Sequence, residues 1–166
     1  MKKLKPMVYM PNRMNTILYR EEIDGFICDI KSYGTHPCCY ISASINDNVL
    51  FKYLSKLNDY MLDYILNVHG GITYSDIRND LFIIGWDYEH YDDYAGYYIN
   101  YSSLAKNSKR WTTEELHEEL MECLNQIKNI MNGKQIVQIN NEKLLFKNNK
   151  IVWKIRLTSK LTKVEK

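Results

Sequence analysis

Two histidines and two aspartates near the middle of the chain carry side chains that can bind divalent metals or transfer protons. They are His69, Asp87, His90 and Asp93. Imidazole and carboxylate groups together suit Zn²⁺ or Mn²⁺, and a metal held by them could activate water to hydrolyse a phosphate ester. The sequence therefore makes His69, Asp87 and His90 candidate catalytic residues, and the same three with Asp93 candidate metal ligands.

The same residues also admit a structural interpretation. His69 could donate a hydrogen bond to a backbone carbonyl or to Asp87, because buried polar groups need partners. It would then hold the turn at Gly70-Gly71 against the end of a strand. The spacing matches no established metal signature, so the sequence favours this interpretation and leaves open whether the chain is an enzyme, with a non-enzymatic role preferred. No cofactor is expected, apart from a divalent metal ion under the catalytic hypothesis.

Paired glycines followed by hydroxyl groups raise the question of phosphate binding. Gly70 and Gly71 precede Thr73, Tyr74 and Ser75, and backbone N–H groups with hydroxyls can cradle a phosphate. The stretch contains neither the phosphate-binding G-K-[ST] loop nor a dinucleotide fingerprint. A tight turn whose hydroxyls satisfy the local backbone is the preferred interpretation.

Adjacent cysteines suggest a possible nucleophile. Cys38 and Cys39 point to opposite faces if they lie on a strand, so only one of them could serve, with His36 or His90 as its base. Cys39 shares the apolar face of its strand and is assigned to the core. Cys38 remains the weaker alternative.

An acidic, tyrosine-rich segment follows the apolar run at 81–86. Tyrosine offers a large contact area with a polar tip, and clustered carboxylates can occupy a surface that evolved to hold nucleic-acid phosphates. This pattern indicates a protein-binding surface. The predicted binding residues are Tyr74, Asp87, Tyr88, Glu89, Tyr91, Asp92, Asp93, Tyr94 and Tyr97.

Charge is unevenly placed along the 166 residues, although the net charge is only +2. Residues 76–122 hold 11 acids and 4 bases, whereas 134–166 hold 9 bases and 2 acids. The two segments could neutralise each other in the fold, or the acidic one could face a partner. The basic strands with Trp153 could bind nucleic acid through Lys147, Lys150, Lys154 and Arg156, although lysines on an edge strand also discourage aggregation.

Composition indicates one ordinary globular domain. Hydrophobic residues make up 45% of the chain and charged residues 25%, which is typical of folded proteins. There is no apolar run long enough for a membrane span and no signal-peptide pattern, so a cytoplasmic protein without membrane contact is expected. The four cysteines lack a disulfide or zinc spacing and are expected to be free thiols.

Hydrophobic periodicity predicts an α+β fold with an antiparallel sheet. Asp24-Gly25 between strands at 16–23 and 26–32 indicates a hairpin, because both turn positions need positive φ. The remaining predicted elements are strands at 38–45 and 81–86, a helix at 49–67, a strand or irregular segment at 88–101, a helix at 112–132 opened by a Thr112/Glu115 capping box, and strands at 135–139, 143–147 and 150–158. Residues 1–133 would form the core domain, and 134–166 a basic β-meander packed on it.

The central stretch resembles a known family. His69-Gly-Gly-Ile-Thr-Tyr-Ser75, followed by Ile84-Gly-Trp-Asp87-Tyr-Glu-His90, is similar to an uncharacterised family of small bacteriophage and prophage proteins with an HGG[LI]TYS…G[FW]DxxH motif. Residues 34–41, with their cysteines, resemble a further patch of that family. Tyr88 and Glu89 stand where its members often have a cysteine and a small residue.

The resemblance implies a mobile genetic element acting inside a bacterial host. The leading expectation is therefore a non-enzymatic, anti-CRISPR-like binding protein that inhibits a host defence complex, with a CRISPR-type nuclease as the expected target, through the acidic tyrosine-rich surface. The alternative is a small metal-dependent hydrolase or nucleotide-binding protein acting on a phosphodiester or signalling nucleotide.

Overall fold

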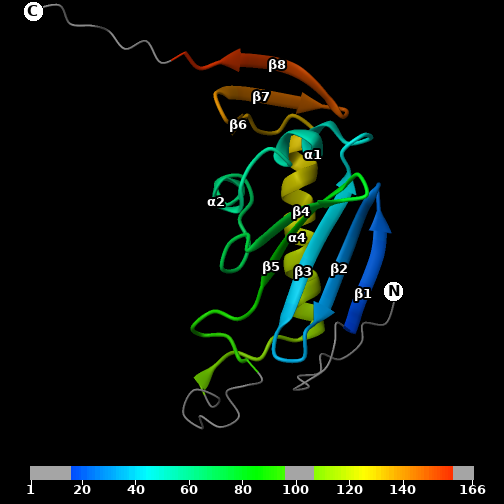
Figure 1. Ribbon diagram of the computed structural model, residues 1–166, viewed down its shortest axis with the longest axis vertical. Helices are drawn as coiled ribbons and strands as arrows, with labels where there is room; N and C mark the ends of the chain where they lie inside the picture. Colours follow the sequence, from blue (N-terminus) through cyan, green and yellow to red (C-terminus); the bar gives the residue numbers. More distant parts are fainter. Residues whose placement is uncertain (1–15, 96–106, 159–166) are drawn as a thin grey trace, which may run out of the picture.

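The protein has an α+β fold built on an antiparallel sheet, as the sequence predicts (Figure 1). The computed structural model describes residues 16–95 and 107–158. The five strands lie in the order β1 (Thr16–Ile23), β2 (Phe26–Ser32), β3 (Pro37–Ser44), β5 (Leu81–Asp87) and β4 (Tyr74–Arg78). Helix α4 (Thr113–Met131) runs along one face of this sheet, and a three-stranded meander crosses one end of the molecule.

The first three strands form as predicted. Asp24 and Gly25 have φ of +52° and +81°, as a two-residue hairpin requires. The predicted alternation is also confirmed, because one face of β2 and β3 is buried against the helices. The residues on this face are Phe26, Cys28, Ile30, Cys39, Ile41 and Ala43.

The predicted helix at 49–67 is wrong as a single element. The chain forms α1 (Val49–Leu54) and α2 (Asp59–Leu62) instead. Asn48 accepts a hydrogen bond from the Phe51 N–H at 2.9 Å, and Asn58 caps α2 in the same way. A second asparagine cap starts a new helix rather than continuing the first. In a continuous helix Tyr64 would share the buried face of Leu50, Leu54 and Leu57, but it is 75% exposed.

Strand β4 was not predicted. The sequence predicts no strand directly before 81–86, but only Asn79 and Asp80 of this segment form a turn, with φ of +49° and +63°. Tyr74–Arg78 pairs with β5 along its whole length. It lacks an apolar alternation because it is an edge strand with no fully buried side chain.

Helix α4 supplies most of the cover for the sheet. Both hydrogen bonds of the capping box between Thr112 and Glu115 are present, and Gly133 ends the helix region with φ of +73°. The apolar stripe of this helix is buried, with Leu116, Leu120, Cys123, Leu124, Ile127 and Ile130 inside. All four cysteines are buried free thiols, as expected. No helix in the described part of the chain is both long enough and apolar enough to cross a membrane.

The C-terminal meander consists of β6 (Val137–Ile139), β7 (Glu142–Lys147) and β8 (Lys150–Arg156), close to the predicted ranges. Its inner face contributes Val137, Ile139, Leu144 and Phe146 to the same hydrophobic cluster as the main sheet. Phe146 packs edge-on against Tyr53. The tail at 159–166 lies outside the described residues.

Candidate functional site

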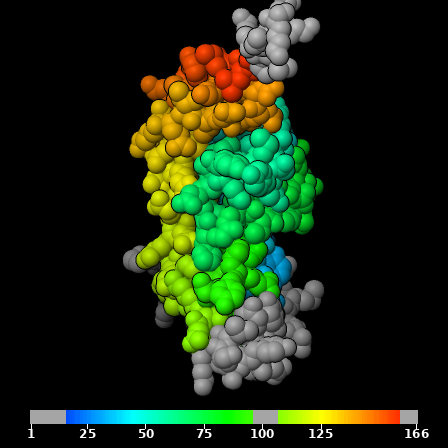
Figure 2. All heavy atoms as spheres, turned by 90° about the vertical axis from the view of Figure 1, so that its left-hand side faces the viewer, coloured from blue at the N-terminus to red at the C-terminus, as the bar shows by residue number. Residues whose placement is uncertain are grey.

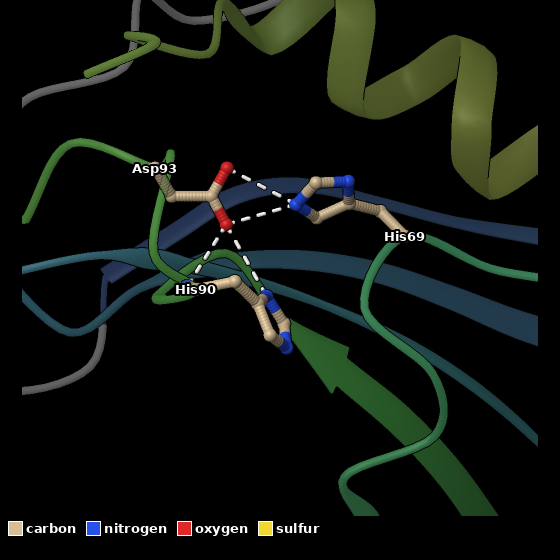
Figure 3. Close-up of side chains that lie close together, drawn as sticks. All are labelled: His69, His90 and Asp93. Atoms are coloured by element: carbon tan, nitrogen blue, oxygen red, sulfur yellow. Dashed lines mark hydrogen bonds and ion pairs between the residues drawn. The ribbon is translucent and has the colours of Figure 1, made fainter. Parts of the chain in front are cut away.

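Two loops meet beyond one end of the sheet and bring together His69, His90 and Asp93 (Figure 3). His69 lies between α2 and β4, and the other two lie in the loop after β5. Nε2 of His69 is 2.8 Å and Nδ1 of His90 is 3.2 Å from the same Oδ2 of Asp93. One ligand atom from each residue lies within 4.8 Å of the others. We call these three residues the His–Asp–His cluster.

Asp93 is the buried centre of the cluster, with 1% of its surface exposed. Besides the two imidazoles, its carboxylate accepts the indole N–H of Trp111 at 2.7 Å and the backbone N–H of His90 at 3.0 Å. Burial on its own raises the pKa of this carboxyl. The hydrogen bonds from Trp111, His69 and the His90 backbone outweigh burial, so the pKa lies below its ordinary value. The residue is therefore held as a carboxylate.

The ring of His69 is fixed on several sides. Tyr88 stacks on it with ring centres 5.1 Å apart and planes at 4°, and Trp111 meets it edge-on at 4.8 Å. Asn67, two residues before His69, exchanges two hydrogen bonds of 2.8 Å with the side chain of Gln126 on α4. Packing and hydrogen bonds thus hold the imidazole with Nε2 toward Asp93 (Figure 3).

Tyr88 belongs to this support and not to a surface, which corrects its prediction as a binding residue. It is fully buried, and its hydroxyl accepts from Nε1 of Trp86 at 2.9 Å and donates to Glu119 at 3.1 Å. Burial, followed by the nearby thiol and carboxylate, raises the pKa of this hydroxyl. Tyr88 therefore ties the His69 ring to α4.

Gly70 leaves the space that the His90 ring occupies. A Cβ at Gly70 would lie only 2.0 Å from Cε1 of His90, and the residue has φ of +68°. Gly71 also has positive φ, so the expected tight turn is present. The N–H of Gly71 donates to Val68, that of Ile72 to Asp63 and that of Thr73 to Gly85. These N–H groups are occupied within the fold, which argues against a phosphate cradle.

Asp87 lies apart from the cluster. It ends β5 opposite Cys38 in the register, and its carboxylate accepts the backbone N–H of Glu89 at 3.1 Å. The carboxylate that His69 contacts is that of Asp93, in place of the predicted Asp87. Among the described residues, the side chains close enough to share a metal ion are therefore His69, His90 and Asp93, and Asp87 is not one of them.

The predicted tyrosine-rich surface is only partly exposed. Tyr94 and Asp93 are buried together with Tyr88, so these three do not present an outer face. Tyr91 is 85% exposed and Asp92 beside it is exposed. Tyr74, Asp87 and Glu89 are half-buried, and Tyr97 lies outside the described residues.

The remaining half-buried members of that surface have partners within the fold. Tyr74 donates to Asp76 at 3.1 Å, and Glu89 lies 3.1 Å from Nδ1 of His36.

Cys38 does not have the surroundings of a nucleophile. It is 5% exposed, and burial raises the pKa of its thiol to about 12. A reactive cysteine needs a lowered pKa and access to solvent. Its proposed bases are engaged elsewhere, His36 with Glu89 and His90 with Asp93.

A pocket of about 320 Å³ adjoins the cluster. Its walls include His69 from the loop and Glu119, Glu122 and Gln126 from α4. His69 was predicted from the sequence, whereas Glu119, Glu122, Gln126 and Trp111 were not. Trp111 directly precedes the helix cap Thr112. A hydrophobic residue at that position often packs against the first turn of the helix, so its place in the sequence could have indicated that it is buried.

Two of the three separations within the cluster, those between Asp93 and each imidazole, match those of ligands that share a metal ion; the third, between the two imidazole nitrogens, is at most 4.8 Å. Two ligands bonded to one Zn²⁺ at about 2.0 to 2.2 Å lie roughly 3 to 3.6 Å from each other. The two nitrogen–oxygen separations of 2.8 and 3.2 Å are within a few tenths of an ångström of this range. The side chains of His69 and His90 are 29% and 35% exposed, so a fourth position could face solvent or the pocket.

Comparison with known proteins assigns no relative: no family model, curated protein or solved structure matches the chain. The site therefore has to be interpreted from its own geometry.

Proposed function

We propose that the protein binds a divalent metal ion, Zn²⁺ or Mn²⁺, at His69, His90 and Asp93, and uses it to hydrolyse a phosphodiester. The observation that carries this proposal is the convergence of two imidazole nitrogens on one buried carboxylate oxygen, at 2.8 and 3.2 Å. Three protein ligands with an open fourth position are the usual arrangement of a catalytic zinc site. A metal held by these three residues would supply an activated water for the hydrolysis.

The surroundings of the cluster suit this role. Each imidazole must present an unprotonated nitrogen to the metal, so affinity for metal falls as pH is lowered. The indole of Trp111 and the backbone N–H of His90 remain bonded to Asp93 and orient it. Such outer-shell partners fix the ligand geometry of metal sites. Tyr88 performs the corresponding task for His69 by stacking on its ring.

The adjoining pocket defines how a substrate would enter. At about 320 Å³ it accommodates a small molecule, such as part of a signalling nucleotide. Glu119 and Glu122 on its wall repel a phosphate while the metal is absent. Substrate binding should therefore depend on metal, and one of these carboxylates could receive the proton of the attacking water.

A hydrolysis assay tests the proposal. With Zn²⁺ or Mn²⁺ present, the protein is expected to cleave bis(p-nitrophenyl) phosphate and cyclic dinucleotides above the rate of the metal alone. Loss of a ligand in His69→Ala or His90→Ala should lower the rate by more than the roughly 10- to 100-fold that loss of an outer-shell partner costs. His117→Ala is the matched control, because His117 contacts Tyr19 and lies outside the cluster. Hydrolysis no faster than the metal blank would refute the catalytic part.

We propose as a second candidate that the protein inhibits a host defence nuclease inside the bacterial cytoplasm. The observation in its favour is the exposed pair Tyr91 and Asp92, an aromatic side chain 85% exposed beside a carboxylate. In the described residues no ion pair joins the acidic segment 76–122 to the basic segment 134–158. The exposed carboxylate of Asp92 is thus not neutralised by the basic segment. The resemblance to phage proteins supplies the setting.

This candidate predicts protection of phage against a CRISPR-carrying host. Expression of the wild-type chain should restore plaque formation, and the double variant Tyr91→Ala/Asp92→Lys should lose this protection, because it removes the exposed ring and reverses the neighbouring charge. Glu118→Lys, at an exposed position on α4, is the control for charge reversal elsewhere. Equal protection by the double variant would exclude this surface as the interface.

A further inference from the structure

The outer face of the C-terminal meander carries apolar and basic side chains. Leu144 and Phe146 of β7 are buried in the core, so the alternation of the strand places Lys143, Leu145 and Lys147 on the opposite face. This face is opposite the one that joins the hydrophobic core, and the meander lies at one end of the molecule (Figures 1 and 2).

The register of β8 extends this outer face. Trp153 pairs with Leu145, Ile155 with Lys143, and Lys150 with Lys147. Leu145 pairs with Trp153 but Phe146 pairs with Ile151, so Val152 is an extra residue in β8, and this bulge brings Trp153 to the outer side.

The apolar side chains on this face are open to solvent. Trp153 is 41% exposed and Ile155 is 47% exposed. Ile136, one step before β6, is 54% exposed and shares the face of Gln138 by alternation. The result is a row of Ile136, Leu145 and Trp153, in which Leu145 is half-buried and the other two are exposed.

Positive charge flanks this row on both sides. Residues 134–158 contain six bases and one acid, Glu142, which is bound by Lys154 at 2.6 Å. Along the strands, Lys143 lies two residues to one side of the Trp153–Leu145 pair. The Lys147–Lys150 pair lies on the other side. Each is about 7 Å from the Trp153–Leu145 pair. All three of these lysines are exposed, and none has a carboxylate partner in the described part of the chain.

We propose that this face, defined by Lys143, Leu145, Lys147, Lys150 and Trp153, binds single-stranded nucleic acid. A base stacks on the exposed indole, the aliphatic side chains beside it extend the platform, and the flanking lysines contact phosphates. Charged grooves with exposed aromatic rings bind single strands in this way. Lysine is depleted in protein–protein interfaces, so an acidic protein segment suits the face less well.

This binding face is separate from the His–Asp–His cluster. The meander and the loop after β5 lie at opposite ends of the molecule in both views (Figures 1 and 2). Its variants therefore leave the metal ligands untouched, and the test below does not depend on the proposed hydrolysis.

Titration of the full chain with fluorescein-labelled oligo-dT and oligo-U tests the proposal. Trp86 and Trp111 are buried, with 1% and 7% exposure, so quenching of tryptophan fluorescence on binding reports mainly on Trp153. Trp153→Ala should weaken binding by roughly 5- to 150-fold, the range that corresponds to stacking of one base on an aromatic ring. Three phosphate contacts predict a slope of about −2 in a plot of log affinity against log salt concentration.

Charge variants distinguish binding by the lysines of this face from binding by the positive charge of the whole segment. Lys143→Gln/Lys147→Gln/Lys150→Gln should flatten the salt dependence. Lys154 was predicted from the sequence to contact nucleic acid, but it pairs with core-facing Leu144 and binds Glu142, so it lies on the other side of the sheet. Lys154→Gln should therefore keep wild-type affinity. Affinity weaker than about 10⁻⁴ M for both oligonucleotides would overturn the proposal. Unchanged binding by Trp153→Ala, or equal competition by poly-glutamate, would overturn it too, the latter in favour of an acidic protein partner.

Discussion

Gly70→Ala is expected to abolish metal binding although it removes no ligand. The new Cβ would lie 2.0 to 2.5 Å from three atoms of the His90 ring. The ring must swing away, and Nδ1 of His90 then leaves its position 3.2 Å from Asp93. Calorimetric titration with Zn²⁺ measures the effect, and no saturable heat is expected from this variant.

Gly25→Ala is the matched control. Gly25 also has positive φ, at +81°, but a Cβ there meets nothing within 4 Å. Both variants incur the cost of a left-handed backbone for alanine, about 1 to 2 kcal/mol of unfolding free energy. Only Gly70→Ala should lose zinc. Wild-type zinc affinity in Gly70→Ala would show that His90 does not need its observed position to bind metal.

Asp93→Asn is expected to be the most destabilising single change near the site. The carboxylate accepts hydrogen bonds from Trp111, from the His90 backbone and from both imidazoles. An amide cannot accept all of them, and its NH₂ would face other donors. The free energy of unfolding, measured with urea, should fall by about 3 kcal/mol. Asp92→Asn, at the exposed neighbouring position, should change it by less than about 0.5 kcal/mol.

The effect should also depend on pH. The pKa of Asp93 is lowered in the folded state, so its contribution to stability is present above the ordinary carboxyl range of about 4 and is lost as pH falls through the lower folded value. The wild type should therefore lose more stability than Asp93→Asn between about pH 5 and pH 2. Parallel curves for the two proteins would contradict the assigned role of this carboxylate.

The elements that the sequence predicted well are those determined by local rules. Asp24-Gly25 specifies a hairpin turn through its backbone preference, and the Thr112/Glu115 capping box starts α4 through two reciprocal hydrogen bonds. The failure at 49–67 had a local cause as well. Asn58 is the N-cap of α2, but the apolar residues on both sides of it keep helical spacing, so the pattern predicted one continuous helix.

The composition of the site depended on tertiary packing. Asp87 is closer in sequence to the apolar run at 81–86. The chain continues past it and turns, so that the carboxylate of Asp93 contacts the imidazole of His69 instead. Nothing in the spacing specifies that path. Burial of Tyr88 did have a signal, because Phe82, Ile84, Trp86 and Tyr88 alternate and are all buried. Because Tyr88 lies among acidic residues and other tyrosines, it was assigned to the surface segment and not to the buried alternation of the strand.

The residues that α4 contributes to the site could not be predicted from the sequence pattern. Glu119 and Gln126 follow the His–Asp–His cluster by more than 25 residues along the chain. They reach it because α4 lies along the sheet, where Glu119 bonds Tyr88 and Gln126 holds Asn67. Such contacts follow from the register of the whole helix against the sheet.

The most direct test of the central claim is the X-ray absorption spectrum of the zinc-loaded protein after removal of free metal. We predict one zinc ion per chain, with two imidazole nitrogens and one carboxylate oxygen at about 2.0 to 2.2 Å and a water in the remaining position. The imidazole signal should disappear in His69→Ala/His90→Ala. A protein that retains no zinc, or a first shell unchanged in the double variant, would contradict the metal site at His69, His90 and Asp93.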